Sequence, residues 1–148
     1  MKVGIIGLGL MGGSLAKAIS FGTEHTVWGT NRSEEAIQKA LFVGAIEKEL
    51  TKEDLCKCDL VMVSLYPQAS IDYINENAHL FKKGAIVMDI SGVKRYVCDA
   101  LYETAKANGI KELYDDIAID NSSVSLFLKC GFAEVLRTSE FVLVKKEI

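Results

Sequence analysis

Three glycines close to the start of the chain constrain its fold more tightly than any other feature of the sequence. A short apolar, β-branched run ends at Gly7, and Gly9 and Gly12 complete a G-x-G-x-x-G pattern before an Ala- and Leu-rich helical segment. Gly7 allows a tight turn, because glycine alone has free access to positive φ angles. Gly9 has no Cβ, so a phosphate can approach its backbone, and Gly12 lets the helix lie close against the strand.

A strand, a glycine turn and a helix in this order predict a loop that binds the pyrophosphate of a dinucleotide. The free N–H groups and the partial positive charge of the helix N-terminus attract phosphate. The alternative interpretation is a glycine-rich turn of another kind of α/β protein. The cofactor-binding residues that we predict in this loop are Gly7, Leu8, Gly9, Leu10, Met11 and Gly12.

Composition limits the kind of protein that can carry this loop. The chain has 148 residues, of which 49% are hydrophobic and 25% charged, as in an ordinary soluble globular domain. Its net charge of −3 and the lack of a clustered basic stripe argue against nucleic-acid binding. No apolar run is long enough to span a bilayer, and Met1-Lys2 leads straight into a strand rather than a signal peptide. We therefore expect a cytoplasmic protein that does not bind membranes.

Cysteine spacing gives no sign of a metal site. Of the four cysteines, Cys56 and Cys58 alone are close in sequence, and a single intervening residue is not a usual zinc-ligand spacing. We expect reduced thiols and no bound metal.

The alternation of apolar runs with helical patterns predicts the fold class. Strands are expected at residues 2–6, 25–30, 59–65 and 85–90, and helices at 12–21, 33–42, 68–81 and 93–108. Four strand–helix units in succession predict right-handed crossovers and an α/β, Rossmann-like, doubly wound and mostly parallel sheet. We assign residues 1–110 to this dinucleotide-binding domain and 111–148 to a C-terminal segment that packs into the same globule.

The end of the second strand decides which dinucleotide is favoured. An NAD-binding fold places an Asp or Glu there to bind the ribose 2′-OH, whereas this chain has Asn31, Arg32 and Ser33. Arg32 can pair with a 2′-phosphate, and Asn31 and Ser33 can add neutral hydrogen-bond donors. We therefore predict NADP in preference to NAD. Ser33 can equally cap the second helix, with Glu34 and Glu35 in its first turn, and the two roles are compatible.

Two other strand ends are expected at the same edge of the sheet, because ligands bind beyond the carboxyl ends of parallel strands. Leu65, Tyr66 and Pro67 follow the third strand and are predicted to contact the cofactor. Residues 90–94 follow the fourth strand.

Four segments, residues 7–15 (GLGLMGGSL), 27–32 (VWGTNR), 58–67 (CDLVMVSLYP) and 87–94 (VMDISGVK), carry a family resemblance. Together they resemble the N-terminal domain of prephenate and arogenate dehydrogenases, oxidoreductases of tyrosine biosynthesis. The resemblance covers about residues 1–108 and implies oxidative decarboxylation of prephenate or arogenate with hydride transfer to NAD(P). Within that family the Asn-Arg pair resembles the NADP-using members. The resemblance also implies that Ser91 and Lys94 contact the substrate.

The sequence departs from the family pattern in ways that bear on catalysis. Gly92 stands where the family often has a substrate-contacting serine, with Ser91 one position earlier. The family's His-Pro-Met-Ala-Gly segment, whose histidine accepts the substrate's hydroxyl proton, is absent, and so is its helical dimerisation domain. We expect His25 and His79 to be surface or structural residues. A hydride site with no proton acceptor and no substrate wall should be a poor dehydrogenase.

The last 38 residues follow a different pattern. We expect a strand at 112–121, a helix at 122–130, and a β-hairpin formed by 131–137 and 140–145. A resemblance to the C-terminal end of GNAT acetyltransferases rests on the order Asn121, Val124, Leu126, Phe127, Lys129, Gly131 and Phe132. In that family a tyrosine at the position of Phe127 can protonate the leaving thiolate, and Phe127 has no hydroxyl.

Our structural interpretation of this segment is that it completes the parallel sheet and covers its edge. A natural fusion, a frameshifted remnant and an engineered chimera would all have this sequence. The apolar face that the missing helical domain would leave requires a cover, either the tail or a second copy in a homodimer.

Three functional hypotheses follow from these observations. The first is an NADP-binding oxidoreductase domain of the prephenate/arogenate dehydrogenase type, incomplete without its histidine segment. The second is a dinucleotide-binding module with no catalytic activity. The third is an acyl-CoA-binding remnant of a GNAT acetyltransferase.

Overall fold

The computed structural model of the chain describes residues 1–92, 94–110, 112–118, 125, 128–129 and 131–147, with the backbone alone for 94–95, 113–118 and 141. The chain divides into two compact units, Met1–Leu101 and Tyr102–Ile148. The division falls within helix α4 (Lys94–Ala107), and the predicted domain boundary near residue 110 stays a prediction. None of the helices described is long and apolar enough to cross a membrane. The prediction that both parts pack into one globule stays a prediction.

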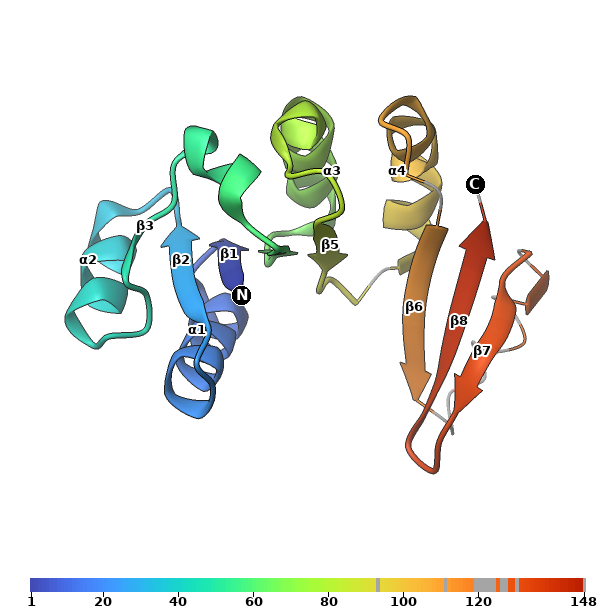
Figure 1. Cartoon of the computed structure of the whole chain (residues 1–148), viewed down its shortest axis with the longest axis horizontal. Helices are drawn as coiled ribbons and strands as arrows, with labels where there is room; N and C mark the ends of the chain where they lie inside the picture. Colours follow the sequence, from blue (N-terminus) through green and yellow to red (C-terminus); the bar gives the residue numbers. More distant parts are fainter. Residues whose placement is uncertain (93, 111, 119–124, 126–127, 130, 148) are drawn as a thin grey trace. The chain divides into compact units, whose positions relative to one another are not determined.

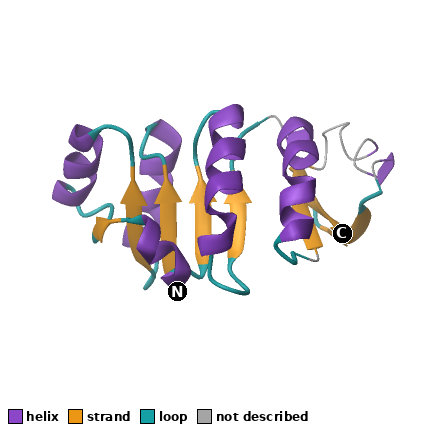
Figure 2. Ribbon diagram, turned by 90° about the horizontal axis from the view of Figure 1, so that it is seen from above, coloured by secondary structure: helices purple, strands orange, loops and turns teal. Residues whose placement is uncertain are grey.

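The first unit is built around a parallel sheet of five strands in the order β3-β2-β1-β4-β5 (Figures 1 and 2). In chain order its elements are β1 (Lys2–Ile6), α1 (Leu10–Gly22), β2 (Thr26–Thr30), α2 (Glu34–Phe42), β3 (Lys48–Glu49), η1 (Lys52–Lys57), β4 (Leu60–Val63), α3 (Pro67–Asn77), η2 (Ala78–Leu80) and β5 (Ile86–Asp89). This arrangement confirms the predicted Rossmann-like α/β class. The two-residue strand β3 and the 3₁₀ helix η1 were not predicted.

Both faces of the sheet are covered, which explains why its strands are apolar almost without interruption. One core lies under α1 and α2 and contains Val3, Ile5, Leu8, Ala16, Val27, Ile37, Ala40, Ala45, Ile46 and Met62. The other lies under η1 and α3 and contains Ile6, Trp28, Leu50, Leu55, Cys58, Val61, Val63 and Ile74. Burying each Val, Leu or Ile side chain stabilises the fold by about 1.5–3 kcal/mol.

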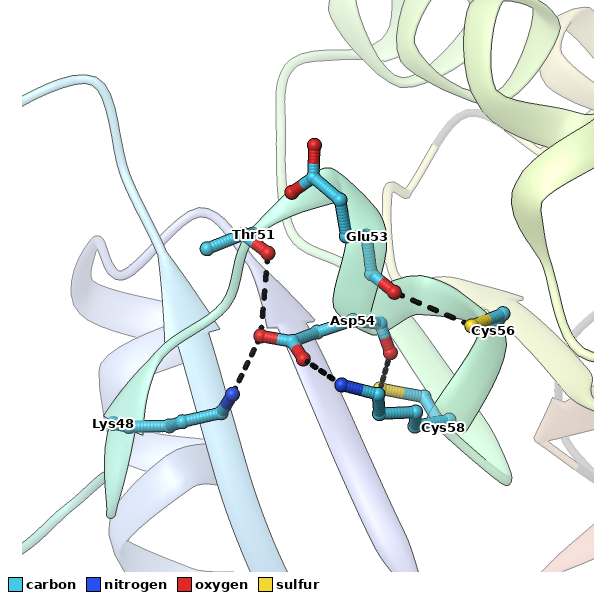
Figure 3. A network of polar contacts seen from close by, with 7 residues as sticks. Lys48, Thr51, Glu53, Asp54, Cys56 and Cys58 are labelled. Carbon is cyan, nitrogen blue, oxygen red and sulfur yellow. Dashed lines mark hydrogen bonds and ion pairs between the residues drawn. The ribbon is translucent and has the colours of Figure 1, made fainter.

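The β3 edge of the sheet is joined to η1 by a buried carboxylate (Figure 3). Asp54 is 4% exposed and accepts hydrogen bonds from Lys48 Nζ (2.6 Å), Lys57 Nζ (2.9 Å) and Thr51 Oγ1 (3.3 Å). The hydrogen bonds from Lys48 and then Lys57 hold the pKa of Asp54 well below its usual range. Lys48 also lies over the ring of Trp28, 4.2 Å from its centroid. These contacts explain how a two-residue edge strand keeps its register.

The second unit holds a separate antiparallel sheet in the order β6-β8-β7, visible in Figure 1. Its strands are β6 (Glu112–Ala118), β7 (Ala133–Arg137) and β8 (Phe141–Glu147). The predicted hairpin is confirmed, because β7 pairs with β8 in antiparallel register. The helix predicted at 122–130 falls almost entirely outside the described residues, and so do Asn121 and Phe127.

The prediction that this segment completes the parallel sheet is wrong. β8 is the central strand of its own sheet, and β6 pairs with it along seven consecutive residues, from Glu112 opposite Glu147 to Ala118 opposite Phe141. Because β8 has a neighbour on both sides, its backbone hydrogen bonds are used within this sheet. The two ends of the segment thus pair with each other instead of with β5.

Candidate functional site

The loops that carry the predicted site residues all leave the carboxyl ends of parallel strands. β1 is followed by α1, β2 by α2, β4 by α3 and β5 by α4, so these four helices begin at one edge of the sheet. From β1 the sheet grows to β2 on one side and to β4 on the other. The point where strand order reverses is where sheets of this kind bind their ligands.

The glycine loop has the geometry that its spacing predicts. Gly7 has a φ of +95°, and a Cβ there would lie 2.4 Å from the carbonyl oxygen of Ser64. A Cβ on Gly12 would lie 1.9 Å from the carbonyl oxygen of Gly7, so only glycine lets α1 approach so closely. A Cβ on Gly9 would meet nothing within 4 Å, which leaves open space beside its backbone. Ligand contact by the loop stays a prediction.

The helix that follows this loop is suited to hold an anion, whereas its neighbour α2 is not. Helix α1 begins after Gly9 with no side-chain cap and no acidic residue in its first turn. Helix α2 is capped by Ser33, whose Oγ accepts a hydrogen bond from the N–H of Ala36 (3.4 Å), and carries Glu34 and Glu35 in its first turn. The positive end of α1 is therefore left for a phosphate group, and that of α2 is neutralised by its own side chains.

Asn31 ties the end of β2 to the glycine loop. Its Oδ1 accepts a hydrogen bond from the N–H of Leu8 (3.3 Å), beside the backbone bond from Gly7 N–H to the Thr30 carbonyl (2.8 Å). This bond involves only the carbonyl oxygen, so both amide N–H donors of the side chain remain available to a ligand. Arg32 is exposed and makes no hydrogen bond or ion pair with the residues that the structure describes.

The side chains of Leu8 and Leu65 pack against the two cores of the sheet. The side chain of Leu8 is buried in the core under α1 and α2, against Gly29, where a Cβ would lie 2.9 Å from Leu8 Cδ2. Leu65 packs against the opposite core. The Leu8 side chain is therefore not free to cover a ligand, whereas that of Leu65 is partly exposed, and the cofactor contact predicted for Leu65 stays a prediction.

Three other predicted residues expose large apolar side chains around the same loops. Leu10 is 92% exposed, Met11 65% and Tyr66 85%. These values are far above those of the core, and two of the side chains lie in the first turn of α1 while Tyr66 precedes α3. Such side chains can shield the flat rings of a bound ligand from water. Pro67 stands at the first position of α3, where its missing N–H is not needed.

The loop after β5 places a serine against a carboxylate. Asp89 is the last residue of β5, and its Oδ2 accepts hydrogen bonds from both the N–H (3.1 Å) and the Oγ (2.5 Å) of Ser91. Lys94 begins α4, and its side chain lies outside the described part of the chain. Tyr96 in the first turn of α4 donates a hydrogen bond to Oε1 of Gln68 at the start of α3, which links the two loops.

Both histidines lie away from this edge. His25 precedes β2, and its Nδ1 is 3.4 Å from the N-terminal amine of Met1, which precedes β1. His79 is exposed in η2, before the start of β5. The amino ends of the strands are opposite the glycine loop, so neither histidine can act there as a base. The described residues also hold no cluster of three or more His, Cys, Asp or Glu side chains that could bind a metal ion.

Sequence reasoning missed three residues that shape the site. Ser64 lies beneath Gly7 and Gly12, Gly29 makes room for Leu8, and Asp89 holds Ser91. The sequence signal that could have found them is the same for each: a small or acidic residue lies within one position of the end of a predicted strand.

Comparison with known proteins gives matches to dehydrogenases. The sequence model of one family, the NAD binding domain of 6-phosphogluconate dehydrogenase, matches residues 2–138. The crystal structure of Synechocystis arogenate dehydrogenase matches with a TM-score of 0.68 and 20% identity, over 83% of this chain and 42% of that chain. Prephenate dehydrogenase from A. aeolicus, in complex with hydroxyphenyl propionate and NAD+, matches with a TM-score of 0.65 and 25% identity, over 80% and 42%. An imine reductase from Streptomyces aurantiacus matches with a TM-score of 0.60 and 22% identity, over 80% and 42%.

The matched structures are much longer than this chain and share little sequence identity with it. The chain spans about two-fifths of the length of the structures it matches. The enzymes differ in their reactions, and identities this low show mainly the shared fold. The predicted acetyltransferase resemblance of the tail finds no support in these matches, and the family match runs to residue 138, well into that segment.

Proposed function

This chain belongs to the family of NAD-binding domains represented by that of 6-phosphogluconate dehydrogenase and is a dinucleotide-binding dehydrogenase domain. On that premise we propose that its cofactor is NADP(H) and that its reaction is of the prephenate/arogenate dehydrogenase type. The residues present fit a dinucleotide. The open space at Gly9 and the uncapped start of α1 suit a pyrophosphate, and the exposed Leu10 and Met11 adjoin them.

The observation that carries the cofactor assignment is the state of Asn31. An acidic residue at this strand end would accept a hydrogen bond from the 2′-OH of NAD. The carbonyl oxygen of Asn31 is already used by the N–H of Leu8. The two amide N–H donors, which a carboxylate would lack, match the oxygens of a 2′-phosphate, and the exposed guanidinium of Arg32 supplies the positive charge.

Calorimetric titration of charge variants with NADPH and NADH tests this assignment. A charge-assisted hydrogen bond contributes about 1.5–3 kcal/mol, so Arg32→Ala should weaken NADPH binding by about 10- to 100-fold and leave NADH binding almost unchanged. Lys17→Ala is the matched control, because Lys17 is an exposed cation further along α1. If Arg32→Ala leaves the affinities for both dinucleotides unchanged, the NADP assignment is wrong.

An isosteric variant separates charge from structure. Asn31→Asp keeps an oxygen that can accept the N–H of Leu8 and replaces the amide donors with a negative oxygen. NADPH binding should fall and NADH binding should rise in this variant. A loss of affinity for both dinucleotides would instead mean that the variant disturbs the glycine loop.

The reaction type rests on the segments at residues 7–15, 27–32, 58–67 and 87–94 and on the fold shared with arogenate and prephenate dehydrogenases. Bound NADP+ supplies the hydride acceptor. In our proposal the loop after β5, which carries Ser91 and Lys94, lies beside the reacting groups. Reduction of NADP+ with prephenate or arogenate, followed by the absorbance of NADPH, is the direct test. Turnover of another 2-hydroxy or amino substrate but of neither of these would refute the reaction type.

A second candidate, binding without turnover, is favoured by the position of the histidines. Neither His25 nor His79 lies at the carboxyl edge of the sheet, and the sequence contains no other histidine. We expect the chain by itself to bind NADPH and to reduce NADP+ very slowly with either substrate. NADPH binding in calorimetry together with no product in the absorbance assay would favour this second candidate.

A further inference from the structure

The hydroxyl of Ser91 is held in one direction by the carboxylate of Asp89. The Oδ2 atom of Asp89 lies 2.5 Å from Ser91 Oγ and 3.1 Å from the Ser91 N–H. The position of Asp89 is itself set by the sheet, since it pairs with Val63 in the register of β4 and β5. The N–H of Ile90 donates to the carbonyl of Val63 (3.2 Å) and extends this pairing by one residue.

The chemistry of the pair determines what Ser91 can offer a ligand. A carboxylate accepts hydrogen bonds and cannot donate them, so the hydroxyl proton of Ser91 is directed to Asp89. The lone pairs of Oγ remain, and because Ser91 is only 9% exposed, its hydroxyl can accept only from a ligand group that enters this loop. An anionic substrate group, which needs donors, is therefore not the partner that this serine suits.

The place of the pair in the sheet indicates which part of a dinucleotide it faces. β5 lies two strands from β1, about 10 Å at the usual inter-strand spacing, on the side away from β2. With the pyrophosphate at the glycine loop and the adenosine ribose at Arg32, the nicotinamide half extends over β4 and β5. That half carries hydrogen-bond donors, the carboxamide N–H groups and the ribose hydroxyls.

From these observations we infer that Asp89 is a positioning residue that presents Ser91 Oγ as an acceptor for the carboxamide N–H groups of the nicotinamide. This inference rests on the dinucleotide orientation in the proposed function. It assigns Ser91 to the cofactor rather than to the carboxylates of the substrate.

The test compares NADPH with 2′-phospho-ADP-ribose, which has every part of the cofactor except the nicotinamide. Ser91→Ala and Asp89→Asn should each weaken NADPH binding in calorimetry by about 3- to 10-fold, the effect of one hydrogen bond, and leave the binding of 2′-phospho-ADP-ribose unchanged. Ser91→Thr, which keeps the hydroxyl, should restore most of the NADPH affinity. Glu76→Gln is the control for charge, because Glu76 is exposed on α3.

The double variant separates a positioning role from a general structural one. If Asp89 acts through Ser91, adding Asp89→Asn to Ser91→Ala should produce no further loss of NADPH affinity. Additive losses, or equal losses for both ligands, would overturn the inference.

If the wild-type chain binds NADPH and 2′-phospho-ADP-ribose equally well, the orientation and the inference are wrong while the adenosine-side assignment stands. If it binds neither ligand and prefers NADH, the same variants are compared with NADH and ADP-ribose, and unequal losses there support the inference.

Discussion

Replacing Gly12 with alanine should destabilise the first unit strongly, although alanine is a better helix former than glycine. A Cβ at this position would lie 1.9 Å from the carbonyl oxygen of Gly7 and 3.0 Å from Cβ of Ser64. The first distance is more than 1 Å short of the 3.0 Å below which real Cβ contacts essentially never fall. The obstructing atom belongs to the backbone, so no side-chain rotation can relieve the clash.

The size of the effect follows from what has to move. Helix α1 packs on the sheet through Gly12 and Ala16, which are both buried. Relief of the clash needs a shift of the helix by about 1 Å, which separates Ala16 from the core. Overpacking of this kind usually lowers stability by about 1–3 kcal/mol, and a backbone clash belongs at the upper end. We expect a loss of about 3 kcal/mol in the free energy of unfolding.

The neighbouring glycines provide matched controls. A Cβ on Gly13 would lie 3.5 Å from the Leu8 carbonyl oxygen, an ordinary contact, and a Cβ on Gly9 would meet nothing within 4 Å. Gly13→Ala should therefore keep or slightly raise stability, by up to about 1 kcal/mol. Gly9→Ala places alanine at the N-cap of α1 and should lower stability by no more than about 1 kcal/mol; it should weaken NADPH binding, because its methyl group would occupy the space that we assign to the pyrophosphate.

Urea unfolding followed by tryptophan fluorescence measures these differences. Trp28 is the single tryptophan of the chain and is 6% exposed within the first unit, so its emission reports the unfolding of that unit. A loss below about 1 kcal/mol for Gly12→Ala, or an equal loss for Gly13→Ala, would refute the argument from close packing.

Three further predictions concern buried polar groups. The hydrogen bond from Lys48 lowers the pKa of Asp54, so the ionised carboxylate stabilises the fold above the unfolded pKa of about 3.9, and this stabilisation is lost as the pH falls below that value. The difference in Tm between wild type and Asp54→Asn should therefore be largest near neutral pH and shrink below about pH 4. A difference that stays constant with pH would contradict this. Burial raises the pKa of the Cys58 thiol to about 11, whereas Cys56 is exposed. Iodoacetamide at pH 8 should therefore label Cys56 and leave Cys58 unmodified, as peptide mapping would show. Equal labelling of the two cysteines in the folded chain would disprove this prediction. The Oγ of the fully buried Ser70 has no hydrogen-bond partner among the described residues. In urea unfolding, Ser70→Ala should therefore leave the free energy of unfolding unchanged or raise it by up to about 1 kcal/mol. A loss above about 1 kcal/mol would count against this.

The fold of the first unit could be predicted because its signals are local. Each main strand is a short apolar run, and Gly44, with a φ of +70°, follows the end of α2, where glycine is a common helix stop signal. Strand β3 could not be predicted, because two residues carry no periodicity and its register depends on contacts of Lys48 with distant side chains. The C-terminal sheet was misassigned for a similar reason, since the pairing of Glu112 with Glu147 joins positions far apart in the chain.

The candidate site shows the same division between local and distant interactions. The turn at Gly7 and the close approach at Gly12 follow from the glycine spacing alone. The bond between Asn31 and Leu8 joins residues 23 positions apart, and no pattern in the sequence reveals which atom of the amide is used. The pair formed by Asp89 and Ser91 is local, but the sequence does not show which way the hydroxyl proton is directed.

The bonds from Gly7 N–H to Thr30 and from Leu8 N–H to Asn31 fasten the glycine loop to β2. We expect an arriving phosphate to meet a loop that these bonds hold in place, so that association does not require a slow change of the backbone. Dinucleotides that share the pyrophosphate should therefore associate at similar rates. The difference between NADPH and NADH would then lie in residence time, because the contacts at Arg32 form around a ligand that is already seated.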